Sequence, residues 1–197
     1  MSRVPLENIF HAPPEIATQR LLLRRLMYSD IKAFYHYASN EKVAQHVLWE
    51  AHRSLTDTFF TIQGHRFAYR HRLPCSWALV LQETGDLIGT IGFSDYSPEH
   101  KRGELGYSLA EEQWGKGFAT EALTALTDFL WNETDVLRLQ AIVEADNPAS
   151  IRVLEKSGFQ AEGTMQSYVI NKGKPSDVIL FGMTRRQWEA LTSPESP

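Results

Sequence analysis

The sequence predicts a single α+β domain built around one sheet. The 197 residues suit one domain, and no linker, repeat or low-complexity tract divides them. Apolar residues make up 43% of the chain and charged residues 22%, which is the balance of an ordinary folded protein. Strand-like and helix-like patterns follow one another along the whole chain. We expect one domain over residues 1–197, with a core over 16–190 and loose ends at 1–15 and 192–197.

The first half of the chain predicts a strand, two helices and an antiparallel meander. A strand is expected over residues 18–26. Ser29-Asp30 and Ser54 carry helix-start signals, and the second helix is expected to reach Arg72. The strands of the meander are expected over residues 76–82, 87–93 and 102–109, with Glu83-Thr84-Gly85-Asp86 as a hairpin turn.

The second half predicts three more helices and three strands. Apolar residues recur on one face of a helix over 117–132, and a strand follows over 137–143. Asn147-Pro148 begins the next helix, because a proline is tolerated in the first turn, and Gly158 ends it. The chain then predicts strands over 160–170 and 176–183 and a short helix over 186–191.

Charge and cysteine content narrow the class of protein. The chain has 20 Lys and Arg against 24 Asp and Glu, a net charge of −4. A general nucleic-acid binder is basic, so no nucleic-acid partner is expected. Cys75 is the single cysteine, which excludes an intrachain disulfide. There is neither a secretory apolar core at the N-terminus nor an apolar run of about 20 residues, so we expect a cytoplasmic protein without a membrane partner.

A glycine-rich loop between a predicted strand and a predicted helix is the most informative segment. It runs from Gln113 to Thr120 and contains Gly115, Lys116 and Gly117. The first N–H groups of a helix lack internal partners and carry partial positive charge, which makes such a loop an anion site. A P-loop would need Ser or Thr after the lysine, and a dinucleotide fold would need Gly or Ala at Thr120. Two interpretations of the segment remain: a loop that binds a pyrophosphate, or a glycine-rich connection that binds no ligand.

Four segments in this order are similar to the GCN5-related N-acetyltransferase (GNAT) superfamily. The opening and closing strands resemble its ribosomal-protein acetyltransferase (RimJ/RimL-like) branch, and the likeness extends over about residues 16–190. The segments are Glu104-Leu105-Gly106-Tyr107-Ser108-Leu109, the loop Gln113–Thr120, Asn147-x-x-Ser150, and Leu154-Glu155-Lys156-Ser157-Gly158-Phe159. The branch is indicated by Thr18-x-Arg20-Leu21-x-Leu23-Arg24 and Asp177-Val178-x-Leu180.

The resemblance implies a mostly antiparallel, mixed central sheet whose strands splay apart to admit acetyl-CoA. The acetyl group would pass directly to an amine, with acetyl-CoA as cosubstrate. In such a fold, one strand pairs with the pantetheine arm and the glycine loop holds the pyrophosphate. The cofactor-binding residues implied are Tyr107, Ser108, Leu109, Gln113, Gly115, Lys116, Gly117, Phe118, Ala119, Thr120, Asn147 and Ser150.

Three residues are candidates for catalysis. The resemblance makes Glu104 the base that takes the proton from the amine through a water. Leu154 stands where many members have a tyrosine, so Ser150 is the candidate to hydrogen-bond the leaving sulfur, and Tyr168 ranks below it. Each residue also has a structural alternative: a solvent-facing strand glutamate, a helix-capping hydroxyl and a packed tyrosine.

Residues 34–71 are expected to cover the acceptor. They are rich in aromatic residues and contain five histidines, which we interpret mainly as packing and solvated side chains. No His-Glu-x-x-His occurs, so no metal is expected. The acceptor is a protein N-terminal amine or a small amine, and a homodimer is left open. The alternatives are a non-catalytic acyl-CoA-binding module and, disfavoured by its loop, a P-loop hydrolase.

Overall fold

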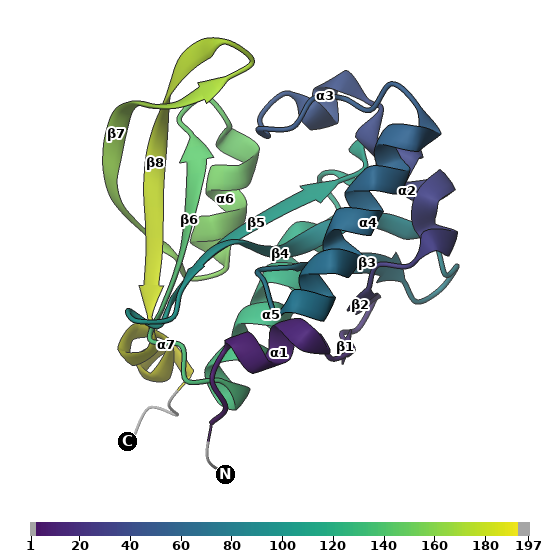
Figure 1. Ribbon diagram of the computed structural model, residues 1–197. Coiled ribbons are helices and arrows are strands. Elements are labelled where there is room, and N and C mark those ends of the chain that lie inside the picture. Colours follow the sequence, from purple (N-terminus) through teal and green to yellow (C-terminus); the bar gives the residue numbers. More distant parts are fainter. Residues whose placement is uncertain (1–2, 193–197) are drawn as a thin grey trace.

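The computed structural model describes residues 3–192 and confirms the α+β class and the mostly antiparallel sheet (Figure 1). The strands are β1 (Ile16–Ala17), β2 (Leu21–Arg25), β3 (Ser76–Leu81), β4 (Leu87–Ser97), β5 (Arg102–Leu109), β6 (Arg138–Glu144), β7 (Gln160–Asn171) and β8 (Lys174–Thr184). The helices are α1 (Glu7–His11), α2 (Ile31–Ala38), α3 (Glu41–Ala44), α4 (Leu55–His71), α5 (Phe118–Glu133), α6 (Pro148–Lys156) and α7 (Arg185–Thr192).

The eight strands form one sheet in the order β1-β2-β3-β4-β5-β6-β8-β7. Every neighbouring pair is antiparallel except β5 and β6, which are parallel. A parallel pair needs a crossover connection, and α5 supplies it. Register between β5 and β6 holds only from Arg102 opposite Arg138 to Glu104 opposite Gln140. Figure 1 shows the two strands diverging beyond this point, which is the splay that the resemblance implied.

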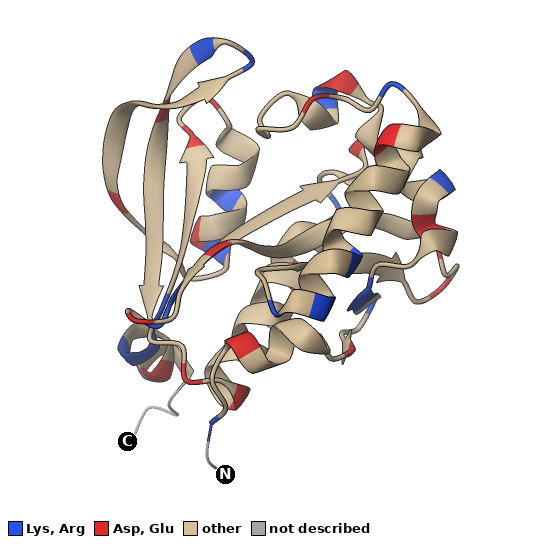
Figure 2. Ribbon diagram, viewed as in Figure 1, with Lys and Arg blue, Asp and Glu red and all other residues tan. Residues whose placement is uncertain are grey.

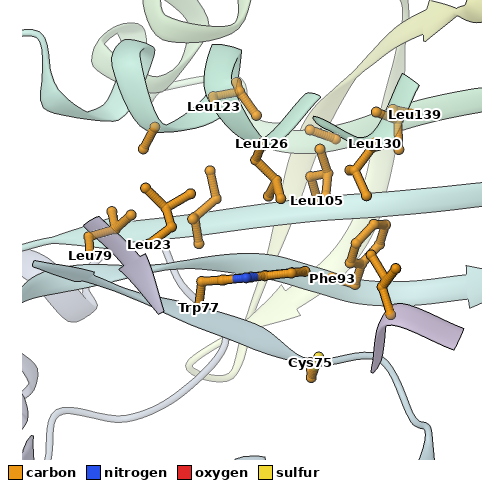
Figure 3. Close-up of a cluster of buried hydrophobic side chains, with 14 of the residues drawn as sticks. Leu23, Cys75, Trp77, Leu79, Phe93, Leu105, Leu123, Leu126, Leu130 and Leu139 are labelled. Carbon is orange, nitrogen blue, oxygen red and sulfur yellow. The ribbon is translucent and has the colours of Figure 1, made fainter. Parts of the chain in front are cut away.

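Helices cover both faces of the sheet. On one face, leucines at helical spacing along α5, such as Leu123, Leu126 and Leu130, pack on Leu23 and Leu105 of the strands (Figure 3). On the other face, α2 and α4 lie across β3 and β4 (Figure 1). The alternation of strand side chains between the two faces produces this division.

Local signals explain where the main helices begin. The Ser54 side chain accepts from the Asp57 N–H and Asp57 reaches back to the Ser54 N–H, a capping box that starts α4. The Asn147 side chain accepts from the Ser150 N–H, with Pro148 in the first turn of α6. Gly158 follows α6 with a φ of 85°, as expected for a helix end. These boundaries confirm the sequence prediction.

The N-terminal segment differs from the expectation of a loose end. Within the described part of residues 1–15, α1 packs into the core, and Leu6 and Phe10 are fully buried. Pro14 accepts a hydrogen bond from Nε1 of Trp77 at 2.8 Å. The prediction of a loose N-terminal end was wrong. Only a few residues of this segment contact the core, so the sequence shows no helical period there. The expected loose tail from residue 193 onward lies outside the described residues.

Between residues 3 and 192, no helix combines the length and the apolar character needed to cross a membrane.

Candidate active site

The splay between β5 and β6 opens into a cavity of about 880 Å³. One wall comes from β5 and the loop after it, and another from Ala141–Val143 of β6 and the start of α6. The edge of β5 from Leu105 to Leu109 is not in register with β6. An extended ligand chain in the splay therefore finds a strand edge to lie against.

The glycine loop turns the end of β5 into the start of α5. Gly115 and Gly117 have φ angles of 73° and 84°, the left-handed region that favours glycine. Gly117 is the N-cap of α5 without a side-chain cap, and the first N–H that bonds within the helix is that of Glu121. The N–H groups before it have no intrahelical acceptor, and Phe118, Ala119 and Thr120 line the cavity. This geometry suits an anion, and binding of a pyrophosphate here stays a prediction.

Arg20, the residue before β2, holds the glycine loop in place through its side chain. Its Nε donates to Glu121 of α5 at 2.6 Å, and its Nη1 donates to the carbonyl of Lys116 at 2.9 Å. The guanidinium lies 4.3 Å from the centre of the Phe118 ring. Sequence analysis quoted Arg20 only as a family feature. Nothing in its local sequence indicated a partner about a hundred residues away.

Lys116 is the one residue from Gln113 to Thr120 that does not line the cavity, whereas Gln113 does. Gln113 accepts a hydrogen bond from Nζ of Lys116 at 3.0 Å. Trp114 donates from Nε1 to the Leu109 carbonyl at 2.9 Å, which ties the loop to the end of β5. Pyrophosphate loops of this kind follow the pattern Gln/Arg-x-x-Gly. When Gly117 takes the glycine position of this pattern, its first position falls on Trp114 and not on Gln113.

Tyr107 and Ser150 meet across the splay. The Tyr107 hydroxyl lies 2.7 Å from Oγ of Ser150 and 3.2 Å from the Ser150 carbonyl. Burial raises the pKa of Tyr107 to about 12, although the hydrogen bond with Ser150 opposes the shift. The hydroxyl therefore keeps its proton at neutral pH. Asn147 caps the same helix and also lines the cavity, so the structure brings these three predicted residues together.

The other two catalytic candidates lie outside the cavity lining. Glu104 sits at the last paired position of β5, where one carboxylate oxygen accepts from Ser94 and the other from Gln140, each at 3.0 Å. Its neighbours Ser94 and Leu105 line the cavity. Tyr168 is 58% exposed on β7 and is not brought to the cavity.

Aromatic and imidazole side chains line the side of the cavity opposite the glycine loop. Phe34 and His52 stack with ring centres 5.8 Å apart, and Trp49 lies 5.7 Å from His52. The two His52 nitrogens meet the hydroxyls of Thr58 and Thr61. Burial lowers the pKa of His52, and it lowers that of His65 to about 4. These histidines are neutral parts of a wall, whereas sequence analysis had interpreted them mainly as solvated.

A hydrogen-bonded pair that the sequence did not indicate closes this wall. Nδ1 of His46 lies 2.8 Å from Glu144 at the end of β6, and Asn171 of the β7–β8 hairpin donates to the other Glu144 oxygen at 2.8 Å. Burial opposes ionisation of Glu144, but the hydrogen bonds from Asn171 and His46 outweigh it and hold its pKa below the usual range. His46, Glu144 and Asp146 each offer a potential metal-ligand atom, and these atoms lie within 4.8 Å of one another. Both Glu144 oxygens are already engaged, and the absence of a metal stays a prediction.

Comparisons with known proteins agree with this geometry. The sequence profile of the acetyltransferase (GNAT) domain matches residues 20–160. An N-acetyltransferase of Bacillus subtilis, YoaA, is 32% identical over 172 residues, which cover 87% of this chain and 97% of that protein. The ribosomal-protein-serine acetyltransferase of Escherichia coli is 27% identical, with 83% and 92% covered. A structure of RimL, a ribosomal L7/L12 alpha-N-protein acetyltransferase in complex with coenzyme A, has a TM-score of 0.79 at 23% identity, with 87% of this chain and 98% of that one covered.

The profile spans more than half of the chain, and YoaA exceeds 30% identity over nearly the full length of both chains. The fold likeness to RimL agrees with this assignment. This chain therefore belongs to the GNAT acetyltransferase family, is similar to members of its RimJ/RimL-like branch, and is an acetyl-CoA-dependent N-acetyltransferase.

Proposed function

We propose that the cavity holds acetyl-CoA with its pyrophosphate on the N-terminus of α5 and its pantetheine arm along β5. The free N–H groups of Phe118, Ala119 and Thr120 supply the anion site. The edge of β5 beyond Glu104 supplies backbone groups for the amides of the arm. Glycine at positions 115 and 117 keeps the approach to the phosphates open.

The transfer is a direct attack of the acceptor nitrogen on the thioester carbon. The N–C bond forms, the C–S bond breaks, and the sulfur leaves as a thiolate that takes up a proton. Ser150 is placed to donate a hydrogen bond to that thiolate, which takes its proton from water. When Tyr107 donates to Oγ of Ser150 at 2.7 Å, the serine proton is free for the sulfur. A backbone N–H near Leu109 would stabilise the developing oxyanion, an effect worth about 3 kcal/mol in other acyl transfers.

The proton lost by the amine goes to Glu104 through a water in this proposal. Glu104 lies next to Leu105 and Ser94 of the cavity lining, one step outside it, so a water is needed to bridge the gap. The acceptor is a primary amine, either at a peptide N-terminus, as the names of the ribosomal-protein acetyltransferases suggest, or on a small molecule. A cytoplasmic location and a homodimer stay predictions.

One observation carries this proposal: the uncapped start of α5 opens into the same cavity as the unpaired edge of β5. We test it with Gly117→Glu, which puts a carboxylate at the phosphate position and an L residue at a φ of 84°. Acetyl-CoA affinity measured by calorimetry should fall by about 100-fold or more, since tenfold corresponds to 1.4 kcal/mol.

Gly85→Glu is the matched control. Gly85 has a φ of 77° and open space around it, but it lies in the turn between β3 and β4 and does not line the cavity. This variant meets the same backbone strain and should keep wild-type affinity. Equal affinity of the Gly117→Glu variant and wild type would refute the loop assignment. Tight acetyl-CoA binding with no thiol release for any amine would instead favour the non-catalytic binding module.

A further inference from the structure

We propose that the acceptor is an amine carrying a single positive charge on an apolar or aromatic body, and that polyamines are poor acceptors. This inference rests on the proposed function, because it concerns the acceptor side of the same cavity. The acceptor wall is defined here as Phe34, Tyr37, Val43, Val47, Leu48, Trp49, His52 and His65, all of which line the cavity.

The charges around the cavity do not suit a polycation. Among the described residues 3–192, no Asp or Glu belongs to the cavity lining, whereas Lys42, Arg152 and Lys156 do. Arg152 and Lys156 belong to α6, beside the splay (Figure 2). Polyamine recognition requires carboxylates to pair with the second and third ammonium groups, because a buried unpaired charge is costly. The mildly acidic net charge of the chain is therefore located elsewhere on the molecule.

The acceptor wall is apolar and electrically neutral. Phe34 and Tyr37 are 4% and 2% exposed, and Trp49 is half-buried beside them. His65 stays neutral at pH 7 because burial lowers its pKa to about 4. Stacked rings and neutral imidazoles offer dispersion contacts and hydrogen bonds but no counter-charge. Such a surface stabilises an aromatic or aliphatic group, with an aromatic pair adding about 1 kcal/mol beyond area burial.

Glu144, at the end of β6 beside this wall, is not available to a ligand. Glu144 accepts hydrogen bonds from His46 and Asn171 and so has both oxygens engaged. Nζ of Lys172 donates to the carbonyls of Ala44 and Val47, each at 2.8 Å. The β7–β8 hairpin thus holds the segment after α3 from both sides of His46. The wall is preformed, and the Glu144 carboxylate is engaged in holding it.

The neutral wall also assists the chemistry. Moving an ammonium group from water into an apolar site disfavours its charged form and lowers its pKa. The neutral amine, which is the form that attacks the thioester, becomes more abundant in the cavity than in water. A polyamine gains less, because its remaining charges must stay solvated. The same wall therefore selects the acceptor and prepares it for attack.

The experiment compares amines in a thiol-release assay with saturating acetyl-CoA. The panel is 2-phenylethylamine, a peptide with N-terminal Phe, a peptide with N-terminal Asp, and spermidine. We expect kcat/KM to be at least about tenfold higher for an apolar amine than for spermidine, equivalent to 1.4 kcal/mol. The first two compounds separate a small-molecule acceptor from a peptide N-terminus, since both present the same chemistry.

Three variants locate the selectivity in the wall. Trp49→Ala should lower kcat/KM for the preferred apolar amine by about tenfold or more while acetyl-CoA affinity stays unchanged. Phe60→Ala is the matched control, because Phe60 is 61% exposed on the outer face of α4 and does not line the cavity. Leu48→Asp places a carboxylate in the lining at a position that is 68% exposed, and it should raise kcat/KM for spermidine.

Two results would overturn the inference. The first is a wild-type preference for spermidine over every apolar amine. The second is equal loss of activity in the Trp49→Ala and Phe60→Ala variants. Both would leave the transferase proposal intact, since acetyl groups would still be transferred. If acetyl-CoA binds but no amine is acetylated, the transferase proposal fails, and the inference fails with it.

Discussion

The two walls of the cavity recognise their ligands by different means. The cofactor wall presents backbone groups: the free N–H groups at the start of α5 and the edge of β5. The acceptor wall presents side chains contributed by α2, α3, α4 and the segment after α3. Backbone groups bind phosphate and amides whatever the surrounding residues are, so the same wall serves one cofactor. A wall of side chains can be altered residue by residue, so it is where we propose that this chain sets its choice of amine.

The largest effect is expected at the junction of the two walls. Ser150→Ala removes the hydroxyl placed to donate to the leaving sulfur, and kcat should fall by about 100-fold near pH 7, the usual range for a positioned hydrogen-bond donor. The difference in kcat between this variant and wild type should become smaller at high pH, because the leaving thiolate then needs less stabilisation. Tyr107→Phe should give a smaller loss with the same pH trend. Steady-state rates over pH 6–9 measure both.

Ser157→Ala is the control for this pair. Ser157 lies at the other end of α6, with its hydroxyl buried away from the cavity. It should leave the pH profile unchanged. If the pH profiles of the Ser150→Ala variant and wild type run parallel, Ser150 acts only through its backbone N–H in the capped turn of α6.

A smaller effect is expected at Glu104, which belongs to neither wall but lies where the splay begins. Glu104→Gln keeps the shape of the side chain and removes its basicity, so the rate at neutral pH should fall by about tenfold while acetyl-CoA affinity is retained. Asp95→Asn is the matched control, since Asp95 is exposed and lies opposite Glu104 on β4. Rates within twofold of wild type across pH 6–9 would show that Glu104 is not the base.

The smallest effect concerns the stability of the acceptor wall. His65 has a folded-state pKa of about 4, below the ordinary value of about 6.5, so the unfolded chain binds a proton that the folded chain does not. As far as His65 is concerned, the free energy of unfolding is highest above pH 6.5, and it decreases as the pH falls below that value. Between pH 7 and pH 5 this loss is about 2 kcal/mol, at 1.36 kcal/mol per pKa unit.

His65→Gln should therefore lose less stability than wild type between these two pH values in urea unfolding. His71→Gln, at the exposed end of the same helix, serves as the control. If wild type and the His65→Gln variant lose the same stability, the imidazole is protonated in the folded protein, and the neutral description of the acceptor wall is wrong.

Much of the fold could be predicted because its signals are local. The capping box at Ser54, the Asn147-Pro148 start of α6 and the glycine after its end each act over a few residues. The glycine loop was predictable for the same reason, since the anion site is made by consecutive backbone groups. Gln113 lines the cavity and its role stays a prediction, whereas the hydrogen bond from Trp114 to Leu109 was not predicted.

The remainder depended on contacts between distant residues. His46 and Glu144 are 98 residues apart in the sequence, and neither has a neighbour that suggests a partner. Arg20 is equally far from the loop it supports. α1 was missed because its five residues are too few to show a helical period, although Leu6 and Phe10 are fully buried. Pairings of this kind arise from the order of the strands in the sheet.

The sequence by itself determined the α+β class, the order of most elements and the chemistry of the cofactor wall. These follow from periodicity, helix caps and a glycine loop, which are properties of short segments. The sequence also indicated the segment that supplies the acceptor wall, but only the tertiary structure decided its neutrality and the pairing of Glu144 with His46. The physical reason is that burial and charge pairing depend on which distant segments come into contact, and desolvation acts only after that contact is made.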